Sequence, residues 1–105
     1  MTLNEKIAKI VKSLRQKTDA GEIQWDSTIE DGFITSRPDS SIVIDQIHNV
    51  YRSPETVHRI ILSDSNGKQL AVLDETELPE PQDLVDLYDR VSSSKAEELA
   101  DAWLQ

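Results

Sequence analysis

The chain has 105 residues, of which 37% are hydrophobic and 30% charged, and 20 acidic against 11 basic residues give it a formal net charge of −9. It has no cysteine, which excludes disulfide scaffolds, thiolate zinc sites, iron–sulfur clusters and cysteine nucleophiles. No apolar run approaches the roughly 20 residues that span a bilayer. We therefore expect a single cytoplasmic domain, residues 1–105, that does not bind membranes.

The first segment predicts a helix, because its apolar residues recur at helical spacing. These residues are Leu3, Ile7, Ile10, Val11 and Leu14. Thr2 followed by Glu5 fits a capping box at the start of the helix. Gly21, after Ala20, can adopt the left-handed conformation that ends a helix.

The middle of the chain predicts strands, because apolar runs alternate there with turn signals. We expect strands over residues 22–27, 33–37, 41–47, 56–63 and 68–74. Residues 48–55 predict a longer loop. Most connections are too short for crossover helices, so the sheet should be an antiparallel meander.

The last segment predicts one long helix after an acidic, proline-containing connection over 75–82. Leu84, Leu87, Tyr88 and Val91 form an apolar stripe along one face of this helix, and the helical spacing continues to Trp103. The alternative is a break at Ser94, which could act as an N-cap with Glu97 three residues later. The fold class is therefore α+β: a four- to five-stranded meander flanked by N-terminal and C-terminal helices.

Asn66-Gly67 is the strongest local signal, because this pair favours a type I′ hairpin turn. Such a turn sets the pairs Ser65–Lys68, Leu62–Ala71, Ile61–Val72 and Ile60–Leu73. In that register, apolar side chains lie on both faces of the ribbon, which is unusual for a sheet with one solvated face.

Three accounts of the second face remain open. The helices could cover opposite faces of the sheet, the face could pair with itself in a homodimer, or it could bind another protein. Trp103 is a further contact candidate, although such a residue often packs within its own fold. The candidate interaction residues are Val57, Ile61, Leu70, Val72 and Trp103.

The sequence indicates no catalytic, cofactor-binding or metal-binding residues. His48 and His58 lack ligand spacing, and we expect both to be surface or half-buried. The turn Asp64 to Gly67 lacks the first and twelfth ligands of a calcium loop. The spacing of Asp83, Asp86 and Asp89 predicts a solvated polar face, and no nucleophile elbow or phosphate-binding loop is present.

Charge is unevenly distributed along the chain. Residues 1–20 carry five basic and two acidic side chains, whereas the remainder has a balance of −12. No aromatic residue interleaves with the lysines for base stacking, so we expect no direct nucleic-acid binding. The basic helix should instead complement the acidic region, within the fold or in a dimer.

Several segments together resemble a recurring kind of short, uncharacterised bacterial protein with a helix, a GEIxW strand, a D-x-NG hairpin and an LxxLY helix. They are Lys17-Thr18, Gly21 to Trp25, Asp64 to Gly67 and Leu84 to Tyr88. The resemblance implies a bacterial cytosolic origin and the same α+β order. Its motifs are structural, so it implies no functional residues.

The favoured function is a non-enzymatic protein-interaction or regulatory module that acts through an apolar sheet face or a helix groove, with a protein partner or a second copy. The alternative is an acidic inhibitor, an immunity-type or DNA-mimic protein that blocks a basic partner. Salt distinguishes them, because association of the inhibitor should slow steeply with ionic strength and apolar docking should not.

Overall fold

A computed structural model describes residues 1–48 and 56–105 of the chain. Its elements are α1 (Leu3–Asp19), β1 (Asp26–Ser27), β2 (Gly32–Arg37), β3 (Ser40–His48), β4 (Thr56–Asp64), β5 (Gln69–Asp74), the 3₁₀ helix η1 (Glu75–Glu77) and α2 (Pro81–Leu104). The five strands form one antiparallel sheet in chain order, which confirms the predicted α+β meander with a helix at each end. Apart from His48, which ends β3, the predicted loop over 48–55 lies outside the described residues.

Both ends of α1 are formed by the residues that the sequence predicts. The Thr2 hydroxyl accepts a hydrogen bond from the Glu5 N–H at 3.2 Å. At the other end Gly21 has φ +71°, and its N–H donates to the Thr18 carbonyl at 3.1 Å. The next N–H, that of Glu22, donates to the Lys17 carbonyl at 2.9 Å. These two bonds form a Schellman motif, which needs the positive φ that glycine adopts freely.

The predicted first strand is shorter than expected. Only Asp26–Ser27 pair with β2, and the preceding residues lie against α1 instead. The Trp25 side chain is buried, and its indole N–H donates to the Thr18 hydroxyl at 2.9 Å. Thr18 in turn donates to the Leu14 carbonyl at 2.7 Å. This anchor holds residues 22–25 at the end of the helix, away from the strand ladder.

The β4–β5 hairpin has the predicted pairs from Ile60 to Leu62 but a different turn. Among the described residues only glycines have positive φ, so Asn66 cannot take the position that a type I′ turn requires. Instead the Gly67 N–H donates to the Asp64 carbonyl at 3.0 Å, and the Asp64 N–H donates to the Lys68 carbonyl at 3.0 Å. This is a type I turn with a glycine bulge, and the register shifts next to Leu62. The predicted pairing of Ser65 with Lys68 is therefore wrong.

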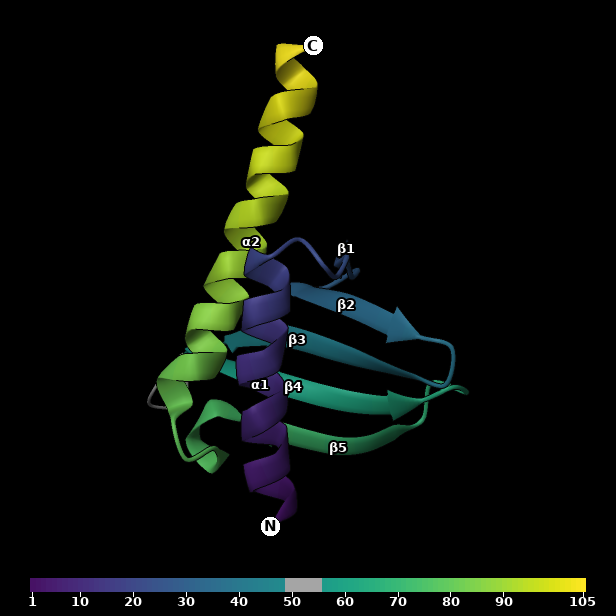
Figure 1. The fold of residues 1–105 in the computed structure, drawn as a ribbon, viewed down its shortest axis with the longest axis vertical. Helices are drawn as coiled ribbons and strands as arrows, with labels where there is room; N and C mark the ends of the chain where they lie inside the picture. The colour runs from purple at the N-terminus through teal and green to yellow at the C-terminus, as the bar shows by residue number, and fades with distance from the viewer. Residues whose placement is uncertain (49–55) are drawn as a thin grey trace.

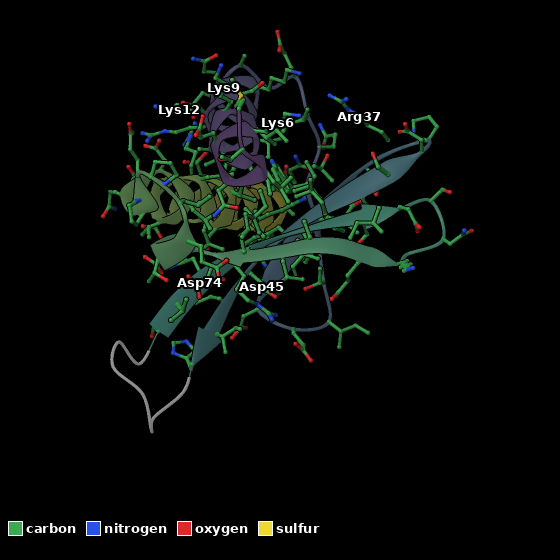
Figure 2. The ribbon with its side chains drawn as sticks, turned by 90° about the horizontal axis from the view of Figure 1, so that it is seen from below. Lys6, Lys9, Lys12, Arg37, Asp45 and Asp74 are labelled. Carbon is green, nitrogen blue, oxygen red and sulfur yellow. The ribbon has the colours of Figure 1, made fainter. Side chains whose placement is uncertain are left out.

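Both helices pack on the same face of the sheet (Figures 1 and 2). The core joins apolar residues of α1 and α2 to Ile44 and Ile60 of the central strands. Its fully buried side chains are Ile7, Val11, Ile44, Ile60, Leu84, Leu87 and Val91. The account in which the helices cover opposite faces is therefore wrong, and no helix of residues 1–48 or 56–105 covers the second face.

The second helix is continuous, as predicted, and Ser94 does not begin a new one. Its last buried residue is Val91, and α2 then continues for about three and a half turns. Figure 1 shows this part extending past the edge of the sheet, beyond β1. We call residues 92–104 the helix tip.

Candidate interaction surfaces

The helix-free face of the sheet, here called the open face, carries a row of β-branched residues. The register places Ile34, Val43, Ile61 and Val72 side by side on four adjacent strands. Ile61 is only 5% exposed although neither α1 nor α2 covers it. Val72, on the outer strand, is 44% exposed. The row therefore offers less apolar surface than its composition suggests.

A charged pair borders this apolar row. Arg59 of β4 lies opposite Asp45 of β3, and its guanidinium donates two hydrogen bonds to the carboxylate, at 2.9 and 2.6 Å. These bonds raise the pKa of Arg59. Asp74, also opposite Arg59, accepts a hydrogen bond from the Thr76 N–H at 2.8 Å and caps η1 (Figure 2). Both acids are thus engaged within the fold.

A groove of about 540 Å³ lies between α1 and the sheet, at the end where the β2–β3 and β4–β5 turns meet. Its apolar lining comes from Leu3, Ile10, Leu14, Ile23, Ile42, Leu62, Leu70 and Ala71. Lys17 and Arg37 contribute positive charge, and Figure 2 shows Arg37 on the same side of the sheet as the lysines of α1. The sequence did not predict this groove, because it joins residues about fifty positions apart.

The helix tip carries three of the large apolar side chains that are exposed among the described residues. Leu99, Trp103 and Leu104 are 67%, 89% and 85% exposed. Ala96, Leu99, Ala100 and Trp103 follow the spacing i, i+3, i+4, i+7, so they share one side of the helix. The acidic residues Glu97, Glu98 and Asp101 lie on the other side.

The five predicted interaction residues fall on three separate surfaces. Val57, Ile61 and Val72 belong to the open face, with Val57 opposite Ile47 and half-buried. Leu70 borders the groove, because the bulge next to Leu62 removes it from the predicted row. Trp103 lies on the tip and does not pack against the sheet or the first helix. Their role in binding stays a prediction.

The basic residues of α1 divide into paired and unpaired groups. Lys12 lies 3.3 Å from Glu80 and 3.8 Å from Asp83, and Arg15 lies 3.1 Å from Asp86. Within the fold, these pairs provide the predicted complement of the basic helix to the acidic region. No ion pair between described residues involves Lys6, Lys9, Lys17 or Arg37.

Asp83 and Asp86 face α1, which corrects the prediction of a simple solvated acidic face; Asp89 is exposed as predicted. Desolvation raises the pKa of Asp83, and the neighbouring Glu80 adds to the shift. Exposed ion pairs of this kind contribute roughly 0–1 kcal/mol each, so they orient the two helices more than they stabilise them.

His58 forms a polar cluster that the sequence did not predict. One Glu75 carboxylate oxygen accepts hydrogen bonds from the His58 backbone N–H at 2.8 Å and from its Nδ1 at 3.0 Å. The ring packs edge-on against Tyr88, with 5.0 Å between centroids. His58 is therefore buried, contrary to the prediction, whereas His48 is exposed as predicted.

This cluster anchors β4 to η1. The His58 Nε2 atom is buried with no hydrogen-bond partner among residues 1–48 and 56–105. Neither the groove nor a smaller cavity beside Trp25 and Val91 includes His58. In the same part of the chain no group of three or more His, Asp or Glu side chains could hold a metal ion.

No protein-family model, curated protein or solved structure matches this chain. Neither described helix is both long and apolar enough to cross a bilayer. The candidate interaction surfaces among the described residues are the open face, the groove and the helix tip.

Proposed function

We propose that the protein is a non-enzymatic protein-interaction module whose main contact element is the helix tip. The supporting observation is that Leu99 and Trp103 are exposed on one side of a helix that continues past its last buried residue. Large exposed apolar patches are typical of protein contact sites, and tryptophan is enriched among residues that dominate binding energy.

The energetics favour a partner for the tip. Burying one leucine-sized side chain contributes roughly 1.5–3 kcal/mol, and the tip exposes three side chains of that size or larger. The accessible surface of 7163 Å² exceeds the roughly 5,900 Å² expected for a compact monomer of this mass, and part of the excess is the tip. The open face is a secondary candidate, because three of the four side chains in its row are buried or half-buried.

Site-specific photo-crosslinking in cells of the source organism tests this function. A photoreactive residue replaces Ala96 or Ala100, which border Leu99 and Trp103 without removing them. Matched controls carry it at Glu98 or Asp101 on the acidic side. We expect discrete protein adducts from the alanine positions and few from the controls, with unchanged circular dichroism.

Equal labelling from both sides, or no adduct from either side, would contradict the proposal. The salt dependence of binding to the captured protein then separates the two classes of function. An association rate that falls steeply with salt would instead favour the acidic inhibitor.

A further inference from the structure

Two apolar surfaces of opposite shape have no packing partner among residues 1–48 and 56–105. The tip is convex and presents Leu99, Trp103 and Leu104. The groove is concave and is lined by side chains such as Ile10, Leu62 and Leu70. In Figure 1 the tip extends past one edge of the sheet, while α1 lies between α2 and the turns that border the groove. The tip of a chain therefore does not reach its own groove.

The two surfaces have similar lengths. The groove follows α1 from Leu3 to Lys17, a distance of roughly 21 Å at 1.5 Å per residue. The tip spans residues 92–104, roughly 18 Å by the same rise. An amphipathic helix lying in an apolar groove is a recurring mode of recognition, with anchors spaced as Ala96, Leu99 and Trp103 are.

Two basic and two acidic side chains line the groove, and the two basic ones are available to the acidic side of the tip. Lys17 and Arg37 border the groove, and neither forms an ion pair with another described residue. The groove also has Asp39 and Asp64, but the Asp64 carboxylate accepts hydrogen bonds from two backbone N–H groups of its own turn. The Asp39 carboxylate accepts one from the Ser40 hydroxyl. The polar side of the tip is acidic.

We propose that the groove is occupied by the helix tip of a second copy of this chain, in a reciprocal exchange that forms a two-fold dimer. This inference rests on the proposed function, because it names the partner of the same tip. A two-fold arrangement makes the contact twice, since each chain donates its tip and receives the other. It buries both unpartnered apolar surfaces in one step.

Mass measurement in solution tests the exchange. From micromolar to millimolar concentration, sedimentation equilibrium should show the wild type approaching twice 11.9 kDa. Trp103→Glu alters the tip and Leu70→Glu alters the groove, both at exposed positions, and each should remain at 11.9 kDa over that range. Val72→Glu, on the open face, is the matched control and should dimerise like the wild type.

Mixing the two monomeric variants identifies the exchange itself. The Trp103→Glu chain keeps an intact groove and the Leu70→Glu chain keeps an intact tip, so one of the two contacts can form between them. The mixture should therefore give a heterodimer that neither variant gives alone, weaker than the wild type. Tip-to-tip pairing would give no such rescue.

A wild type that stays at 11.9 kDa throughout, a mixture without heterodimer, or a Val72→Glu variant that dissociates would each overturn the exchange. Such a result leaves the proposed function standing if crosslinking at Ala100 yields a different protein. If that position yields no adduct, the proposed function fails as well.

Discussion

The two halves of α2 have the same backbone structure and opposite surroundings. From Pro81 to Val91 the helix buries four side chains against α1 and the sheet. In the tip that follows, Ser94 and Lys95 are half-buried near Trp25, and residues 96–104 are exposed. A tip helix of this length alone would be marginal in water, and here it continues from a half that the core already holds. The comparison shows that one half of a helix can stabilise the fold while the other half stays exposed.

The largest expected difference between the halves is in the free energy of unfolding. Leu84→Ala, in the buried half, should lower it by about 2–5 kcal/mol, because it removes buried contacts and leaves a cavity. The same substitution at Leu99, on the tip, should change it by less than about 0.5 kcal/mol in the monomer. Urea unfolding at low protein concentration measures both, and equal losses would show that the tip packs after all.

The anchor that leads into α2 should have the next largest effect. Glu75→Ala leaves the buried Nδ1–H and backbone N–H of His58 without their acceptor, at a cost of about 1–3 kcal/mol. Glu77→Ala, in the same short helix but exposed, is the matched control and should be nearly neutral. If thermal unfolding shows the same loss for both, the His58 cluster does not hold η1 in place.

A smaller effect with a pH signature is expected at Tyr88. Its hydroxyl donates to the Asp31 carbonyl at 3.2 Å, and Tyr88→Phe should cost about 1 kcal/mol. Burial raises the pKa of Tyr88, so the folded state binds the phenolic proton more tightly than the unfolded state does. The contribution of Tyr88 to the free energy of unfolding is complete below the pKa of tyrosine in the unfolded chain, about 10. It decreases as the pH rises toward and through the higher pKa of Tyr88 in the folded state.

The variant Tyr88→Phe cannot lose this stability, so its unfolding curve should approach that of the wild type above about pH 10. Trp103→Phe on the tip is the control and should show no difference at either pH. A constant gap between Tyr88→Phe and the wild type across alkaline pH would show that Tyr88 does not titrate differently on unfolding.

The smallest effect concerns the exposed ion pairs between the helices. Arg15→Gln removes the contact with Asp86 and should lower the free energy of unfolding by less than about 1 kcal/mol. High salt should remove most of that difference, since exposed pairs are screened. A loss that persists in high salt would mean that this pair contributes more than orientation of the helices.

Features set by neighbouring residues were predictable from the sequence. Thr2 and Gly21 correctly mark the ends of α1, because a cap depends only on residues a few positions away. The pairing of Ile61 with Val72 was right although the turn type was wrong, because the bulge lies on the turn side of Leu62 and leaves the pairs beyond it unchanged.

Features that depend on distant packing were not predictable. The periodicity of α2 indicates a long helix, but where its burial ends depends on where the sheet and α1 end, which no local pattern contains. The groove joins α1 to the β2–β3 and β4–β5 turns, about twenty and about fifty residues further along the chain. The sequence predicted a surface or half-buried His58, because its hydrogen bond to Glu75 depends on where η1 packs against β4.

The most direct test of the account is hydrogen–deuterium exchange along α2 as a function of protein concentration. In dilute protein the amides of residues 96–104 should exchange much faster than those of residues 84–91, because only residues 84–91 lie in the packed half of the helix. At high concentration the tip and the groove side of α1 should gain protection together. Protection that is already equal in the two halves when dilute, or a tip that stays unprotected at every concentration, would contradict it.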